Sequence, residues 1–163
     1  MRKFTTRQLA VCGVLAAVYA TITIATSSFA YGPIQFRLSE ALCILPFFAP
    51  YTSVGLFIGC LMANLFSTVS ALDVVVGSAA TLLGCLWTAK CKRLWFVPLP
   101  TVIVNFFMVG AMLAAIYTPD AFLQGFLTMG TQVALGELAV MYVLGLPLLL
   151  LLKKEQYASR LLG

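Results

Sequence analysis

Long apolar runs leave this chain almost no room to fold as a water-soluble domain. Charged residues make up 9% of its 163 positions, against about a quarter in soluble proteins, so no water-facing surface could be built around such runs. The pattern predicts an all-α integral membrane protein with a single domain, residues 1–163. Five runs are plain: Gln8–Ala30, Ser53–Thr68, Val74–Ala89, Leu99–Tyr117 and Phe126–Leu152.

The number of spans depends on the segment Ser39–Ala49, which is short and carries Glu40 and Pro46. If it crosses the membrane, nine of the ten Lys and Arg residues fall on the cytoplasmic side, as the positive-inside rule requires. If it joins Ser53–Thr68 as one span, the Lys90–Arg93 loop and the C-terminal basic cluster fall outside. We therefore predict six transmembrane helices with both termini cytoplasmic.

Several function classes are excluded by what the sequence lacks. The net charge of +5 does not indicate nucleic-acid binding, because the basic residues lie in short clusters between apolar runs. There is no histidine and no G-x-x-x-x-G-K-[ST] phosphate loop. The five cysteines form no C-x-x-C pair and look like small packing residues. We expect neither an enzyme nor a cofactor or metal site.

Ionisable residues at membrane depth are costly and point to function. Arg37 and Glu40 are three residues apart and could pair on one helical face as a structural ion pair. Alternatively, they form the polar wall of an outward-facing pocket. Tyr31, Gln35 and Phe36 would then add hydrogen bonds and a flat apolar surface.

Three further polar residues belong to the candidate pocket. Glu137 lies inside the last apolar run, with no lysine or arginine near it in sequence, and serves either a binding site or a buried interhelical hydrogen bond. Asp73 is either the N-cap of its helix or a ligand contact. Asn64 could join the same cluster, whereas we interpret Asn105 as an interhelical contact.

The charge of this group constrains the ligand. Three acids (Glu40, Asp73, Glu137) and one base (Arg37) sum to −2, so the pocket should favour a cation or a ligand rich in hydrogen-bond donors. The aromatic rings of Tyr31, Phe36 and Phe66 would suit a flat ring.

Small residues form stripes on two helices. Gly55, Gly59 and Ala63 would allow close packing on the third helix. The first helix has a similar face, on which Ala16 and Ala20 either pack within the bundle or dock another membrane protein. This small-residue face of the first helix consists of Gly13, Ala16, Ala17 and Ala20.

Several motifs together resemble the QueT family of queuosine-precursor transporters, over nearly the whole chain. The most specific is Gly32-Pro-Ile-Gln-Phe-Arg-Leu-Ser-Glu-Ala41, followed by Leu45-Pro46-Phe47-Phe48. Similar matches are Gly55-Leu-Phe-Ile-Gly59 with Asn64, Leu72-Asp73 with Gly77-Ser78, and Gly136-Glu137 with Val143-Leu-Gly-Leu-Pro147.

This resemblance implies a substrate-binding S component of an energy-coupling factor (ECF) transporter in the bacterial cytoplasmic membrane. Such a subunit binds queuosine precursors (7-deazaguanine bases, queuine or queuosine) from outside. Its implied partners are a transmembrane coupling protein and two cytoplasmic ATPases. The Ala16-x-x-x-Ala20 face is similar to the alanine motif by which S components dock on the coupling protein.

The implied ligand matches the charge of the pocket. We expect Glu137 or Glu40 to meet the guanine-like edge, and the other acid, or Asp73, to meet an amine. Arg37 and Gln35 would meet the carbonyl oxygen or hold Glu40. Two alternatives stay open: a stand-alone secondary transporter in which Glu137 carries a proton, and a non-transporting membrane assembly subunit.

Overall fold

The computed structural model describes residues 4–30, 36–67 and 70–154, and every element in these ranges is helical. The elements η1, η2 and η3 are 3-10 helices and η4 is a π-helix. In chain order they are α1 (Thr6–Ala25), α2 (Ser27–Ala30), η1 (Leu38–Phe47), α3 (Thr52–Asn64), α4 (Ala71–Thr88), η2 (Leu94–Phe96), α5 (Leu99–Tyr117), η3 (Pro119–Ala121), α6 (Phe122–Val140), η4 (Met141–Gly145) and α7 (Leu146–Lys154).

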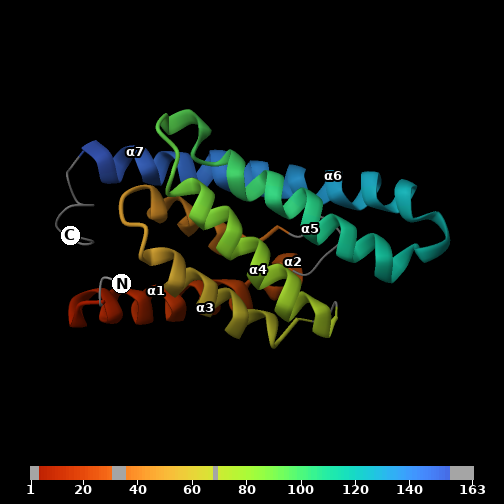
Figure 1. Cartoon of the computed structure of the whole chain (residues 1–163), viewed down its shortest axis with the longest axis horizontal. Helices are drawn as coiled ribbons and strands as arrows, with labels where there is room; N and C mark the ends of the chain where they lie inside the picture. Colours follow the sequence, from red (N-terminus) through yellow and green to blue (C-terminus); the bar gives the residue numbers. More distant parts are fainter. Residues whose placement is uncertain (1–3, 31–35, 68–69, 155–163) are drawn as a thin grey trace.

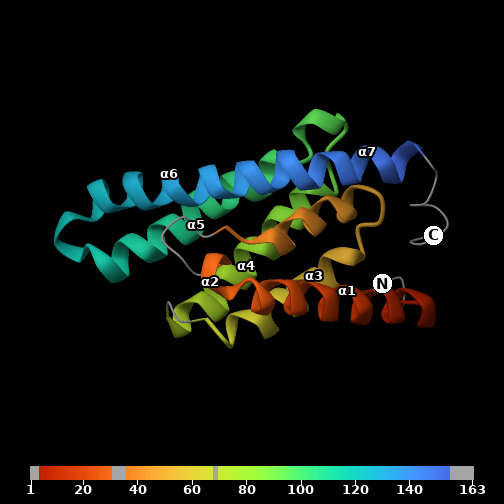
Figure 2. The same ribbon diagram turned by 180° about the vertical axis from the view of Figure 1, so that it is seen from behind.

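The long elements run lengthwise through an elongated bundle in alternating directions (Figures 1 and 2). α1 leads away from the end that carries the N-terminus, η1 returns, α3 leads away again and α4 returns. α5 and the continuous run from α6 to α7 repeat the pattern. The start of α1, the η1–α3 turn, the η2 loop and the end of α7 therefore all lie toward one end.

Exposed basic residues gather at that same end, because they occupy the element boundaries just named. The first turn of α1, the link after α4 and the last turn of α7 carry them. They are Arg7, Lys90, Lys92, Arg93, Lys153 and Lys154. For these six residues, the arrangement agrees with the prediction that the basic clusters share one side; Arg2, Lys3 and Arg160, which the prediction also includes, lie outside the described residues.

Four helical segments of the described chain are long and apolar enough to cross a membrane: α1, α4, Leu94–Tyr117 and Pro119–Lys154. η1 and α3 are shorter apolar helices. Ten residues of 3-10 helix rise about 20 Å, less than the roughly 30 Å of a bilayer's hydrocarbon core. η1 and α3 run in opposite directions, so they do not form one straight helix. The chain is a multi-pass membrane protein.

Local signals in the sequence account for the helix starts. Thr5 and Gln8 form a capping box, in which the Thr5 hydroxyl accepts from the Gln8 amide and the Gln8 side chain accepts from the Thr5 amide. The N-cap of α4 is Ser70, whose hydroxyl accepts from the Leu72 amide at 3.2 Å. Of the two roles predicted for Asp73, N-cap or ligand contact, the N-cap is therefore wrong. Asp73 lies in the first turn, where its carboxyl is buried.

The glycine stripe of α3 packs closely, as predicted, and the structure shows that its partner is α1. A Cβ atom at Gly55 would lie 2.6 Å from the carbonyl oxygen of Cys12, and one at Gly59 would lie 2.8 Å from that of Ala16. Real Cβ atoms do not approach backbone so closely, so only glycine permits this helix separation. Gly110 of α5 and Gly130 of α6 allow a similarly close crossing.

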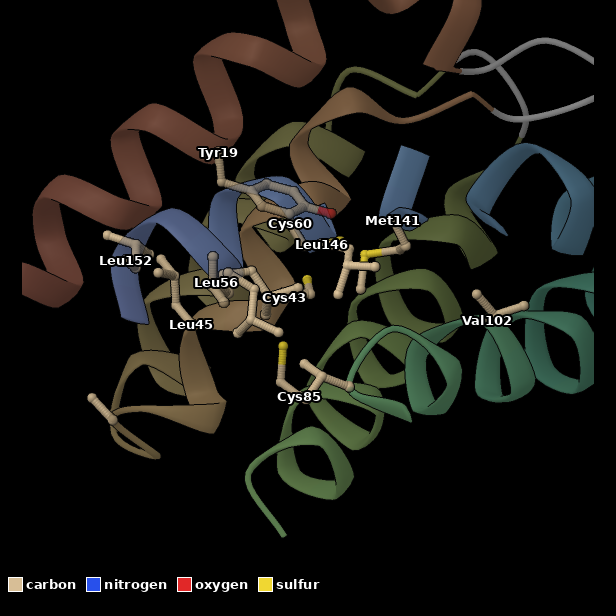
Figure 3. Close-up of a cluster of buried hydrophobic side chains, with 14 residues drawn as sticks. Tyr19, Cys43, Leu45, Leu56, Cys60, Cys85, Val102, Met141, Leu146 and Leu152 are labelled. Atoms are coloured by element: carbon tan, nitrogen blue, oxygen red, sulfur yellow. The ribbon is translucent and has the colours of Figure 1, made fainter. Parts of the chain in front are cut away.

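η1 lies at the centre of the largest buried apolar cluster, between α1, α3, α4 and the η4–α7 run (Figure 3). Side chains from all these elements fill the cluster, including Tyr19 of α1, Leu56 of α3 and Met141 of η4. A 3-10 helix of ten residues is unusually long. Its surroundings, rather than its own hydrogen-bond geometry, hold it in place.

The cysteines are free thiols and most are buried, as expected for packing residues. Cys43, Cys60 and Cys85 belong to the cluster around η1, while Cys12 packs between α1 and α3. Cys91 is partly exposed.

The last span is a single helical run interrupted by the π turn η4, which immediately precedes Leu146 and Pro147. Proline has no amide hydrogen and its ring crowds the carbonyl four residues before it. A π turn at this position relieves that conflict, and such turns often accompany functional sites. η4 begins four residues after Glu137 and contacts η1.

Candidate ligand-binding site

Arg37 and Asp73 form a buried ion pair between the start of η1 and the first turn of α4. The Arg37 Nη2 and Asp73 Oδ2 atoms lie 3.0 Å apart, and Asp73 is fully buried. The Ser67 hydroxyl donates a second hydrogen bond to the same oxygen at 2.8 Å. This corner of the bundle is therefore held together by charge and by hydrogen bonds.

Of the two interpretations of Arg37 and Glu40, the ion pair between them does not match the structure, in which Arg37 pairs with Asp73. Arg37 is the N-cap of η1 and has extended backbone angles, φ −89° and ψ 98°, so it stands outside the helix. Its side chain reaches α4 instead of stacking over the first turn of η1. The spacing of three residues would bring the two side chains together only if both were helical.

Asn64 joins this corner, as predicted. Its amide nitrogen donates to the Asp73 carbonyl at 3.0 Å and to the Ser78 hydroxyl at 3.4 Å. A Cβ atom at Gly77 would lie 2.8 Å from both the Asn64 Nδ2 and the Asp73 Oδ1 atoms. Gly77 thus leaves space that these polar groups occupy.

Glu40 is buried at the centre of the bundle and accepts hydrogen bonds on both oxygens. The Tyr19 hydroxyl from α1 and the Thr81 hydroxyl from α4, at 3.1 Å, donate to Oε1. The Cys43 thiol donates to Oε2 at 3.0 Å. Glu40 therefore connects η1 to two neighbouring helices.

Glu137 is buried on α6 and faces α5, where the Asn105 side-chain amide donates to its Oε2 atom. The predicted interhelical role of Asn105 is confirmed, with Glu137 as its partner. The other oxygen, Oε1, is buried and has no hydrogen-bond partner in the described part of the chain. α6, which carries Glu137, contacts η1, which carries Glu40. We call the buried charged residues Arg37, Glu40, Asp73 and Glu137 the polar cluster.

The aromatic residues expected near the cluster are only partly described. Phe36 directly precedes Arg37 and is 36% exposed, while Phe66 is 64% exposed. Tyr31 and Gln35 lie outside the described residues, and their roles stay predictions.

Sequence reasoning missed the three described residues that donate to Glu40: Tyr19, Thr81 and Cys43. Uncharged residues in apolar runs carry no signal of their own, because tyrosine, threonine and cysteine occur throughout ordinary helix packing. Only the fold shows that their polar atoms converge on Glu40. No group of three or more metal-ligating side chains is arranged to hold a metal ion among the residues described.

An apolar groove of about 350 Å³ runs between α1 and α3, away from the polar cluster. Ala16 lines it, whereas Ala20 is not among its lining residues. The Ala16 backbone packs against Gly59, so this part of α1 is already engaged with α3. Docking of a partner on Ala16 and Ala20 stays a prediction. The lining residues are Phe4, Leu9, Cys12, Gly13, Ala16, Val54 and Ile58.

Comparisons with known proteins connect this geometry to a family. The family model described as QueT transporter matches residues 9–154. The chain is also 32% identical, over 159 residues, to the queuosine precursor transporter QueT of Lactococcus lactis subsp. cremoris (strain MG1363). That alignment covers 88% of this chain and 90% of the relative. No solved structure matches. The family is one of transporters rather than enzymes, and the chain belongs to the QueT transporter family.

Proposed function

We propose that this chain is the S component of an ECF transporter and binds queuosine precursors from outside the cell for ATP-driven uptake. The observation that carries the proposal is the buried polar cluster, in which Glu137 keeps one carboxylate oxygen without a described partner. An apolar bundle has no structural need for so many buried charges, because each is costly to desolvate. The name of the Lactococcus relative supplies the ligand class.

The orientation follows from the basic end of the bundle. If that end faces the cytoplasm, both termini are inside and the chain crosses six times, with η1 and α3 as short spans. The starts of η1 and α4 lie away from the basic end (Figures 1 and 2), so Arg37 and Asp73 would then approach the outer side of the bacterial cytoplasmic membrane. A ligand arriving from outside would meet the polar cluster first.

Energy would come from partner subunits. The sequence has no phosphate-loop motif, so ATP hydrolysis through that motif would occur on two cytoplasmic ATPases, linked through a transmembrane coupling protein. The face of α1 with Ala16 and Ala20 would receive the coupling protein. The apolar groove beside Ala16 supports the part of this assignment that concerns Ala16, because it offers an uncovered surface between α1 and α3.

The ligand would be a 7-deazaguanine base or a larger queuine-type molecule. Glu137 or Glu40 would accept donors from the guanine-like edge, and the other acid, or Asp73, an amine. Arg37 and Gln35 would contact the carbonyl oxygen, and the rings of Tyr31 and Phe36 would cover the flat base. Asn64 would position Asp73 through the contact it makes there.

Uptake and co-purification test the proposal together. We expect the tagged chain to co-purify with the coupling protein and two ATPases, and uptake of labelled precursor to disappear when the ATPases are deleted. Uptake that survives the deletion would favour a proton-coupled secondary transporter instead. A purified chain that shows no thermal shift with any precursor would overturn the binding role and favour an assembly subunit.

A further inference from the structure

The basic end of the bundle carries a compact turn between α4 and α5, residues 89–98, that is closed by its own hydrogen bonds. The Thr88 hydroxyl donates to the Val97 carbonyl at 3.3 Å, across the base of the turn. The Cys91 thiol faces the carbonyl oxygens of Trp87 and Phe96, each at 3.8 Å. The basic residues of this α4–α5 turn are therefore held in a defined place on the surface. They are Lys90, Lys92 and Arg93.

The α4–α5 turn lies against the last span (Figures 1 and 2). Its second half, η2, contacts α7, and the Tyr142 hydroxyl of η4 donates to the Trp95 carbonyl at 2.9 Å. Leu94 packs on the buried cluster that includes Leu152 of α7. Two basic segments that are far apart in the sequence therefore meet at one surface. The second segment is the last turn of α7, with Lys153 and Lys154.

The charge of this surface has one sign. All five basic side chains are exposed. The described acidic residues lie elsewhere, because Glu40, Asp73 and Glu137 are buried inside the bundle. Asp120 lies in η3, at the α5–α6 turn and so at the opposite end (Figure 1). The next residue of the chain, Glu155, lies outside the described residues. Five neighbouring positive charges attract an anionic partner.

Exposed tryptophans indicate the depth at which that partner lies. Trp87 is 48% exposed at the end of α4 and Trp95 is 66% exposed in η2. In membrane proteins, tryptophan rings favour the headgroup level of the bilayer. The basic side chains of the α4–α5 turn lie between these two rings in the sequence. The anion that meets them is therefore in the headgroup layer.

We propose that the five basic residues and the two tryptophans, which we call the basic patch, bind the phosphate headgroup of an anionic phospholipid. The headgroup lies between the α4–α5 turn and the end of α7. The Arg93 guanidinium offers paired N–H donors to phosphate oxygens, and the lysines add charge. Such a lipid links α4 to the last span from outside the protein. This inference goes beyond the proposed function, because it does not depend on the transported molecule.

Fluorescence quenching by brominated lipids tests the proposal on the full purified chain. The two tryptophans of the basic patch are the only ones in the sequence, so their quenching reports lipid at this surface. The chain is reconstituted in phosphatidylcholine that contains either brominated phosphatidylglycerol or brominated phosphatidylcholine. We expect the glycerol lipid to bind at least about fivefold more tightly at low salt, and the preference to shrink at high salt. Equal affinity for the two lipids would overturn the proposal.

Charge-removing variants test whether the site is local. Arg93→Gln should reduce the preference for phosphatidylglycerol by about fivefold, and the double variant Lys153→Gln/Lys154→Gln should reduce it at least as much. Arg7→Gln is the matched control, because it makes the same change at the same end, but α1 lies across the bundle from η2 and α7 (Figures 1 and 2). It should keep the preference within about twofold of the parent.

Two further outcomes would contradict the proposal. Equal losses in Arg93→Gln and Arg7→Gln would show a diffuse charge effect rather than a site. Soluble glycerol phosphate separates a lipid from a free phosphate ester, since it carries the same anionic group without acyl chains. We expect it to leave the quenching by brominated phosphatidylglycerol unchanged at matched ionic strength. Complete reversal of that quenching would assign the basic patch to a dissolved phosphate compound.

Discussion

Arg37 reaches from the boundary of η1 to Asp73 in the first turn of α4, with 3.0 Å between Nη2 and Oδ2. The contact joins two segments 36 residues apart, and both side chains are buried. It therefore fixes the position of η1, the element on which Glu40 is carried. The stability of the whole polar cluster should depend on this pair.

Replacing Asp73 by asparagine should destabilise the protein by about 3–5 kcal/mol, because it leaves a buried guanidinium without its counter-charge. Thermal unfolding of the purified protein in detergent measures the effect. Asp120→Asn is the matched control, since Asp120 is exposed and its change should leave the melting temperature unaltered. Equal melting temperatures for the two variants would show that the ion pair does not hold η1.

The hydroxyl of Tyr19 is a second point of attachment for η1, through Glu40. Tyr19→Phe should cost about 1.5–3 kcal/mol of stability, the usual range for a hydrogen bond to a charged group. Tyr117→Phe makes the same chemical change at a side chain that is 56% exposed, and should be neutral. Equal melting temperatures for Tyr19→Phe and Tyr117→Phe would contradict the role assigned to the hydrogen bond between Tyr19 and Glu40.

The sequence predicts the long helices of this fold well and its central element poorly. α5 spans Leu99–Tyr117 in both prediction and structure, because apolar length alone defines such a helix. The positive-inside rule also separates η1 from α3 correctly as distinct segments. It cannot show that η1 is a 3-10 helix, since that geometry depends on packing against α1, α3 and α4.

The candidate site, too, is predicted only in part from the sequence. Arg37, Glu40, Asp73 and Glu137 are identified from sequence because charges in apolar runs are rare. Several of their partners are not, because Tyr19 and Thr81 lie on other helices and carry no charge that would single them out. A helix cap is one of the two roles that the sequence leaves open for Asp73, but Ser70, three residues earlier, is the N-cap, and Asp73 pairs with Arg37.

Asn105 and Glu137 should be energetically coupled, because the Asn105 amide is the described donor to Glu137. In a double-mutant cycle of Asn105→Leu and Glu137→Gln, unfolding should give a coupling energy of about 0.5–3 kcal/mol. Asn105→Leu alone should also weaken ligand binding, since the Glu137 carboxyl would lose its fixed orientation. Strict additivity of the two changes would show that the contact contributes nothing to stability.

Replacing Gly13 or Gly55, which lie 42 positions apart in the sequence, by alanine should change the stability of the protein in opposite directions. At Gly55 the added methyl would meet the Cys12 carbonyl oxygen at 2.6 Å, so α1 and α3 must separate, and stability should fall by about 1–3 kcal/mol. At Gly13 nothing lies within 4 Å, so alanine should instead stabilise α1 by up to about 1 kcal/mol through its higher helix propensity. Thermal unfolding of the two variants beside the parent protein compares the signs directly. A Gly55→Ala protein that melts at or above the parent temperature would mean that α1 does not pack on α3 at this distance, and the groove beside Ala16 would then have a different shape.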